Sequence, residues 1–175
     1  EAEETVRQVG EAGGVAHAST TDITDLDAVK AGIKGFEAAA GPTDILVNNA
    51  GYSKFVTFLE TGPELWHQMI SINLLGPIHM THTVLTGMAE RRAGVILNIA
   101  SDAGRVGSSG ESVYSACKGG ILALTKTLAR EHARDGIRVN AVCPGPTDTP
   151  LFQSYKDAGD YGRRVFETIS RAFPL

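Results

Sequence analysis

The chain has 175 residues, of which 42% are hydrophobic, and its 16 Lys and Arg against 20 Asp and Glu give a formal net charge of −4. This length and composition suit a single folded domain over residues 1–175 and exclude a disordered chain. The acidic balance argues against nucleic-acid binding, and no apolar run approaches the roughly 20 residues that cross a bilayer. Two cysteines cannot form a disulfide framework, so we expect a cytoplasmic protein.

The two ends of the sequence resemble the interior of a protein more than its termini. The chain begins without Met, and Val6 and Val9 followed by Gly13 are typical of the last turns of a helix and its stop. The sequence ends abruptly at Leu175. We therefore expect it to be part of a longer protein.

Strand-like and helix-like segments alternate along the chain. The strand-like runs are short and apolar, whereas the helical segments carry apolar residues every three or four positions. In chain order we expect a strand at 15–19, a helix at 25–40, a strand at 44–47, a long helix at 63–90 with a kink at Gly76-Pro77, a strand at 95–99, a Gly/Ser loop at 104–110, a helix at 111–134 and a strand at 137–142.

Short apolar strands that do not alternate with polar residues predict a parallel sheet covered by helices on both faces, which is the doubly wound, Rossmann-like α/β fold. Such sheets bind ligands at the carboxyl ends of their strands, so the informative loops follow Val47, Ile99 and Val142. The segment 151–175 mixes glycine, charged and aromatic residues. It is a candidate substrate lid, and a frayed chain end is the open alternative.

Tyr114 and Lys118 lie four residues apart in an expected helix, so their side chains share one face. An ammonium beside a phenol favours the phenolate, and we expect it to lower the tyrosine pKa from about 10. Such a tyrosine can give or take a proton near neutral pH. Taken alone, the spacing also fits a surface lysine beside a half-buried tyrosine.

Further polar residues occur near the ends of the expected strands. Ser101 lies 13 residues before Tyr114, and the run from Asn48 to Gly51 ends another strand. Asn73 lies inside a helix, where asparagine has poor propensity, and the run from Pro144 to Thr149 leaves the last strand. Each has an ordinary structural explanation as a turn, a cap, a packed amide or a chain break. Together, at one sheet edge, they predict a catalytic site.

This combination resembles the short-chain dehydrogenase/reductase family over essentially the whole chain. The resemblance implies an oxidoreductase that interconverts a secondary alcohol and a ketone with a nicotinamide cofactor. In that pattern Ser101 hydrogen-bonds the substrate oxygen, and Tyr114 is the general acid and base. Lys118 lowers the tyrosine pKa and holds the nicotinamide ribose, and Asn73 keeps a water linked to Lys118. The implied catalytic residues are therefore Asn73, Ser101, Tyr114 and Lys118.

The resemblance also implies NAD or NADP as the cofactor, with NAD the favoured of the two. Asp22 matches the acidic residue that lies beside the adenine. The other positions that match cofactor contacts of the family are Asn49, Ala50 and Gly51 at the adenosine ribose, Tyr114 and Lys118 at the nicotinamide ribose, and Pro144, Gly145, Thr147 and Thr149 at the carboxamide and phosphate side.

The sequence departs from the family pattern at both ends. The glycine-rich T-G-x-x-x-G-x-G turn, which holds the cofactor pyrophosphate at a helix N-terminus, is absent from it. The residue of the next strand that selects NAD or NADP is absent too, and the last strand and helix of the family lie beyond Leu175. We therefore expect a sheet that lacks its first strands and its last strand.

Three segments that are less generic than the core motifs of the family indicate a class of substrate. The runs 100–111, 116–120 and 142–149 resemble family members that act on 2-hydroxycyclohexanecarboxyl-CoA. The implied substrate is a β-hydroxy or β-keto acyl-CoA, and a 3-oxoacyl-thioester reductase is the generic alternative.

Two further hypotheses lie outside this class of reaction. One is a non-catalytic scaffold that lost cofactor binding, and the second is an epimerase or dehydratase with the same Tyr-x-x-x-Lys. The complete catalytic set argues against a scaffold, because a scaffold needs none of these residues. The pattern of Asn73 with Pro144-Gly145 argues against an epimerase or dehydratase.

The sequence also bears on assembly and on metal binding. The family resemblance implies that the helices at 64–90 and 111–134 pair with symmetry mates in a homotetramer. The second helix carries a stripe of small residues, Ala116, Gly119, Gly120 and Ala123. Packing of this stripe inside the chain is the alternative. His79 and His82 lie three apart without a third ligand nearby in the sequence, so we expect no metal site.

Overall fold

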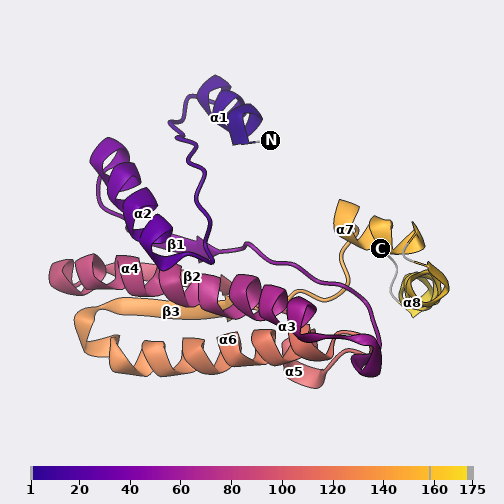
Figure 1. The fold of residues 1–175 in the computed structure, drawn as a ribbon. Helices are drawn as coiled ribbons and strands as arrows, with labels where there is room; N and C mark the ends of the chain where they lie inside the picture. The colour runs from indigo at the N-terminus through magenta and orange to yellow at the C-terminus, as the bar shows by residue number, and fades with distance from the viewer. Residues whose placement is uncertain (1, 158, 173–175) are drawn as a thin grey trace.

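The computed structural model describes residues 2–157 and 159–172. Its parallel sheet has the order β1-β2-β3, with β1 at Ile45–Asn48, β2 at Gly94–Ile99 and β3 at Ile137–Val142. The helices within the described residues are α1 (Ala2–Glu11), α2 (Leu26–Ala40), α3 (Pro63–Ile70), α4 (Gly76–Arg91), α5 (Ala103–Val106), α6 (Ser112–Glu131), α7 (Pro150–Ser154) and α8 (Gly159–Ala172). Figure 1 shows α4 and α6 alongside the sheet, and α7 and α8 beyond the carboxyl end of β3.

The core lies between the sheet and the helices that connect its strands. Because the strands run parallel in register, Leu46 of β1 pairs with Ile96 of β2, which pairs with Val139 of β3. These three side chains share one face of the sheet and pack with the buried Val84 and Met88 of α4. The sequence prediction of a parallel α/β sheet is confirmed.

In the described part of the chain, the opposite face of the sheet is not covered by helices as the sequence predicted. Ile45 and Val47 of β1 alternate with the core residues and are 64% and 51% exposed, and Val142 of β3 is 47% exposed. Within the described residues this face lacks the helix layer that would cover these apolar side chains. The unbroken apolar strands therefore bury one face well and leave the other largely open.

A buried row of polar side chains fixes the helices on the core face near the carboxyl ends of the strands. The Asn48 amide donates to Thr81 Oγ1 of α4 (3.0 Å) and to Asn98 Oδ1 (2.8 Å). The Asn98 amide in turn donates to Thr125 Oγ1 of α6 (2.9 Å). Because both asparagines are buried, a polar atom that loses one of these bonds cannot form a hydrogen bond with water in its place. The row therefore sets the positions of α4 and α6 relative to the strand ends that form the site.

We expect Asn98→Ala in the full-length protein to lower the free energy of unfolding by about 2 kcal/mol, because Asn48 and Thr125 each lose one of their buried hydrogen bonds. The matched control is Asn140→Ala, since Asn140 lies on the neighbouring strand β3 but is exposed. Urea denaturation of both variants measures the difference. Equal loss of stability in the two variants would contradict a structural role for the polar row.

One prediction for the N-terminal region is wrong. Residues 15–19 form no strand, and Val15 is 85% exposed. A strand needs a hydrogen-bonded neighbour, and no described strand lies beside this segment. The segment instead follows α1, which stands apart from the sheet and has no buried residue (Figure 1).

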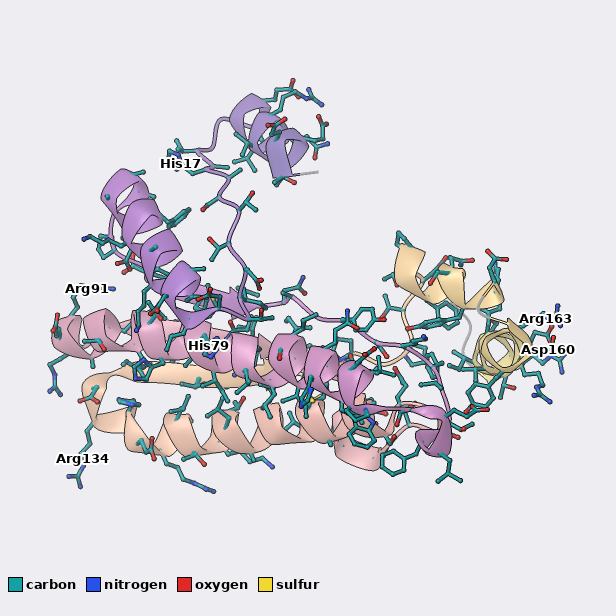
Figure 2. The ribbon with its side chains drawn as sticks, in the orientation of Figure 1. His17, His79, Arg91, Arg134, Asp160 and Arg163 are labelled. Atoms are coloured by element: carbon teal, nitrogen blue, oxygen red, sulfur yellow. The ribbon has the colours of Figure 1, made fainter. Side chains whose placement is uncertain are left out.

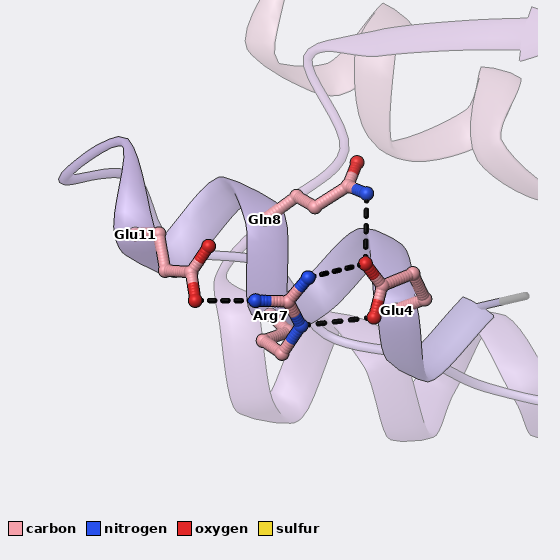
Figure 3. Close-up of polar contacts among 4 residues, drawn as sticks. All are labelled: Glu4, Arg7, Gln8 and Glu11. Atoms are coloured by element: carbon pink, nitrogen blue, oxygen red, sulfur yellow. Dashed lines mark hydrogen bonds and ion pairs between the residues drawn. The ribbon is translucent and has the colours of Figure 1, made fainter.

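Helix α1 is held by contacts along its own surface. Arg7 donates to Glu4 and to Glu11, and the Gln8 amide donates to Glu4 Oε1 at 2.8 Å (Figure 3). The hydrogen bond from Arg7 lowers the pKa of the Glu4 carboxyl. Exposed pairs at this spacing stabilise a helix only weakly, so the predicted helix end forms without contributing to the core.

The long helix predicted over 63–90 is interrupted by a π-helical turn at Ser71–Leu75, directly before Gly76-Pro77. Pro77 has no N–H with which to bond the carbonyl of Asn73, four residues earlier, and the Gly76 N–H bonds Ser71 five residues back. The predicted irregularity is therefore confirmed, and it takes the form of a π turn. It also places Asn73 in the widened turn, where its side chain is fully buried.

Helix α5 is pressed closely on α6. A Cβ on Gly104 would lie 2.6 Å from the backbone carbonyl carbon of Lys118 and 2.8 Å from the backbone nitrogen of Gly119. A Cβ on Gly120 would lie 3.2 Å from Leu74. Two of the four small residues of α6 therefore serve packing inside the chain, whereas Ala116 and Ala123 are less enclosed.

Candidate active site

The loops after β2 and β3 bring the candidate residues to one edge of the sheet. The Ala100 N–H donates to the Val142 carbonyl at 2.8 Å, and the Asp102 N–H donates to the Pro144 carbonyl at 3.0 Å. These bonds continue the strand pairing past the end of the sheet. Ser101 is therefore held beside Pro144 and the loop that follows it.

Ser101, Tyr114 and Lys118 come together at this edge. The Tyr114 phenol forms a hydrogen bond with the Ser101 side chain. The Lys118 side chain is 4% exposed, and its Nζ donates to the Ile99 carbonyl at 2.8 Å while lying 5.6 Å from the centre of the Tyr114 ring. One turn of α6 thus places a phenol and a buried ammonium beside a serine that projects from the end of β2.

The pKa of Tyr114 shifts opposite to the predicted direction. Burial raises this pKa above its ordinary value, the Ser101 hydrogen bond opposes the rise, and the nearby Glu111 carboxylate adds to it. Burial also lowers the pKa of the Lys118 ammonium. The net lowering of the tyrosine pKa that the Tyr114–Lys118 spacing predicted is therefore not found, because desolvation of the phenol outweighs the contributions that favour the phenolate.

Asn73 connects the π turn to the loop after β1. Its amide donates to the Tyr52 carbonyl (2.8 Å) and the Met69 carbonyl (3.0 Å), and its Oδ1 accepts the Tyr52 N–H (3.0 Å). A Cβ on Gly51 would lie 3.2 Å from Asn73 Oδ1 and 3.7 Å from Lys118 Nζ. Gly51 therefore allows the loop to approach both side chains closely, and the Asn73 amide holds that loop in position.

A cavity of about 360 Å³ opens beside these groups. Ser101 and Tyr114 lie in its wall, as do four of the residues predicted to contact the cofactor, which are Pro144, Gly145, Thr147 and Thr149. Thr149 Oγ1 accepts the Phe152 N–H at 3.2 Å and so caps α7. The cavity therefore brings Ser101 and Tyr114 together with the loop after β3.

A smaller cavity of about 130 Å³ lies at the end of β1. Asn49 and Ala50 line it together with Ile23, Pro77 and Met80. Asp22 lines neither cavity, although it directly precedes Ile23. The Asp22 carboxylate accepts hydrogen bonds from the N–H and hydroxyl of Thr24, which lower its pKa.

Residues 1–159 match the family model of the short chain dehydrogenases. The chain belongs to this family. An acetoacetyl-CoA reductase of Shinella zoogloeoides is 44% identical over 133 residues, which cover 76% of this chain and 55% of that protein. The 3-oxoacyl-acyl-carrier-protein reductase FabG of Vibrio harveyi is 36% identical over 136 residues, 78% of this chain and 56% of that protein.

Solved structures agree with this membership. The crystal structure of a gluconate 5-dehydrogenase from Burkholderia cenocepacia J2315, in complex with NADP and tartrate, superposes with a TM-score of 0.84 at 32% identity, over 90% of this chain and 62% of that chain. The short-chain dehydrogenase fold expected from the sequence is therefore confirmed. The chain spans slightly more than half the length of the Shinella and Vibrio reductases.

The C-terminal segment of this short-chain dehydrogenase forms one wall of the large cavity. Phe152, Tyr155 and Ile169 line it, and the Tyr155 ring meets the Phe55 ring edge-on with centres 4.6 Å apart. Asp160 and Arg163 project from the outer side of α8, away from the sheet (Figure 2). Of the predicted lid over 151–175, residue 158 and residues 173–175 lie outside the described residues.

Sequence reasoning missed three buried polar side chains of this cavity: Ser53, Glu111 and Tyr155, each about 8% exposed. For Glu111 the spacing was a usable signal, since it directly precedes α6 and lies three residues before Tyr114 and seven before Lys118. Nothing in the sequence around Ser53 or Tyr155 marks either residue as a neighbour of Tyr114.

His79 of this short-chain dehydrogenase contacts a backbone carbonyl. Nδ1 of His79, on α4, lies 3.0 Å from the Ile23 carbonyl, near the start of α2 (Figure 2).

In the part of the chain that the structure describes, no three His, Cys, Asp or Glu side chains gather as a metal site would require. The helices of that part also include none with the length and apolar character of a membrane span.

Proposed function

We propose that the protein to which this chain belongs interconverts a secondary alcohol and a ketone with NAD or NADP, on a β-hydroxy or β-keto acyl thioester. The observation that carries the proposal is the hydrogen bond between Tyr114 and Ser101 in the wall of a cavity, with the buried Lys118 ammonium beneath the tyrosine ring. Family membership and relatives named as thioester reductases support it.

The proton steps follow from the groups in place. In reduction the Tyr114 hydroxyl donates its proton to the carbonyl oxygen of the substrate, while the Ser101 hydroxyl orients that oxygen by a hydrogen bond. In oxidation the Tyr114 phenolate removes the alcohol proton. The Lys118 charge stabilises the phenolate across the ring, and Asn73 holds the loop beside Lys118. A bound nicotinamide supplies or accepts the hydride.

The residues present fit part of such a cofactor. At Gly51 a Cβ would contact both Asn73 and Lys118, so the absence of a side chain leaves room beside Lys118 for a ribose. Asn49 and Ala50 at the small cavity and Thr147 at the large one would contact it on either side. Asp22 and its bonds to Thr24 lie next to the small cavity, on the side proposed for the adenine.

The substrate assignment is tested with the full-length protein, by following the absorbance of NADH and NADPH with a cyclic and a linear β-ketoacyl-CoA side by side. The cavity wall contains Phe55, Val106, Phe152 and Ile169, which suit an apolar ring as well as a chain. We expect faster reduction of 2-ketocyclohexanecarboxyl-CoA, because the loop 105–111 and the tail that flank the cavity resemble the cyclic-substrate enzymes. Preference for acetoacetyl-CoA leaves the broader thioester class, and activity on neither removes it.

The pH dependence of oxidation should follow Tyr114, since the phenolate is the active form and the rate rises with pH through the tyrosine pKa. The Ser101 hydrogen bond lowers this pKa and the Glu111 charge raises it. We therefore expect Ser101→Ala to move the inflection of kcat/KM to higher pH and Glu111→Gln to move it to lower pH. Initial rates of oxidation between pH 6 and about 11 measure both shifts, and movement in the same direction would contradict the assignment of the inflection to Tyr114.

A homotetramer is the proposed assembly. Ala116 and Ala123 lie on one face of α6, where small side chains allow two helices to approach closely. Gly119 and Gly120 pack inside the chain and are not part of that proposed contact.

A further inference from the structure

One buried carboxylate of the large cavity transfers no proton in the proposed mechanism. Glu111 directly precedes α6 and is 8% exposed. Its Oε1 accepts a hydrogen bond from Ser53 Oγ at 2.5 Å, and the Ser53 hydroxyl is itself hydrogen-bonded by the Tyr155 phenol. Burial and nearby negative charge raise the pKa of that phenol to about 12, so it remains a donor. This chain of bonds fixes the carboxylate in the cavity wall.

The second oxygen of the Glu111 carboxylate is available to a ligand. Only the Ser53 bond to Oε1 engages the Glu111 side chain within the described residues, so Oε2 is available as an acceptor. Ser53, Tyr155 and Glu111 all line the cavity that contains Ser101 and Tyr114. A ligand whose oxygen binds Ser101 and Tyr114 therefore occupies the same cavity as the Glu111 carboxylate.

The charge of Glu111 is not compensated. Among the described residues that line this cavity there is no Lys, Arg or His, and the acids are Asp102 and Glu111. Asp102 forms an ion pair with Arg105 at 3.0 Å on the protein surface. Glu111 has no such partner in the described part of the chain, so the cavity carries the unbalanced negative charge of this one buried side chain.

We propose that Glu111 is a specificity-determining residue that makes this cavity reject substrates with a free carboxylate and accept uncharged acyl derivatives such as thioesters and esters. A second carboxylate would lose its water beside a like charge in a cavity that no described Lys, Arg or His lines, whereas an uncharged acyl group meets no such repulsion. The inference rests on the proposed function, because it names the form in which the β-keto acyl group arrives.

The test compares acetoacetate with methyl acetoacetate, which have the same β-keto group and differ in charge. Calorimetry with the full-length protein and oxidised cofactor gives the dissociation constants of both compounds without turnover, and rates with reduced cofactor give kcat/KM. Glu111→Gln removes the charge and keeps an oxygen that accepts from Ser53. Glu131→Gln removes the same charge at the exposed far end of α6 and is the matched control.

The wild type and Glu131→Gln should prefer the ester, and Glu111→Gln should improve acetoacetate relative to the ester by at least about tenfold. An unchanged ester-to-acid ratio in Glu111→Gln overturns the inference, even where acetoacetyl-CoA is reduced and the proposed function stands. Failure of the wild type to reduce any thioester, together with a shifted binding ratio, overturns the proposed function and supports the charge selection. Circular dichroism checks that each variant is folded.

Discussion

Tyr114→Phe in the full-length protein should lower kcat by about 10²–10⁴-fold in both directions, because it removes the hydroxyl that transfers the proton and keeps the ring. Ser101 cannot replace it, since an ordinary serine hydroxyl is too weak an acid to supply the proton. The dissociation constant of the cofactor should change less than about threefold, because the ring and the Lys118 side chain remain.

Steady-state rates and cofactor titration by fluorescence distinguish these effects. A variant that loses turnover and cofactor binding together would indicate a collapsed site, and the melting temperature would identify that case. If Tyr114→Phe keeps a kcat comparable to that of the wild type, Tyr114 is not the proton donor and the proposed mechanism fails.

Lys118→Met should lower kcat and weaken cofactor binding together, each by about 10–100-fold, since a hydrogen bond to a charged group contributes about 1.5–3 kcal/mol. The thioether chain keeps most of the buried volume of the lysine stem, so packing beneath Tyr114 is preserved. The ammonium acts on both quantities because it lies beneath the phenol and, by the proposal, holds the nicotinamide ribose.

Lys126→Met is the matched control for this change. Lys126 lies two turns further along α6 and is exposed, so its replacement removes the same charge from the same helix without touching the site. Equal effects of the two substitutions would mean that Lys118 acts only through the net charge. A lower kcat with unchanged cofactor affinity in Lys118→Met would remove the ribose contact and leave the effect on the phenol.

The local sequence pattern predicted most of the helices and strands and the residue types of the site. The spacing of Leu26, Val29 and Ile33 predicted α2, which begins at its Asp25 cap, and the runs at 95–99 and 137–142 became β2 and β3 within a residue. Ser101 was predicted from its place after a strand, because the carboxyl ends of parallel strands meet at one edge. Tyr114 and Lys118 were predicted from their spacing of four residues on a helix and from the family resemblance. Residues 15–19 failed because pairing with a neighbouring strand, not β propensity, decides whether a segment becomes a strand.

By itself the sequence determined the identity of the chemical groups: a tyrosine one helical turn before a lysine, and a serine after a strand, in the order typical of short-chain dehydrogenases. Only the tertiary structure decided their electrostatics. Covalent spacing along a helix cannot say that Lys118 Nζ bonds the Ile99 carbonyl, or that burial raises the pKa of Tyr114. Nor does spacing place Ser53 and Tyr155, 102 residues apart, on the same side of Glu111. Desolvation and long-range contacts depend on what packs around a group, and that is a property of the folded chain alone.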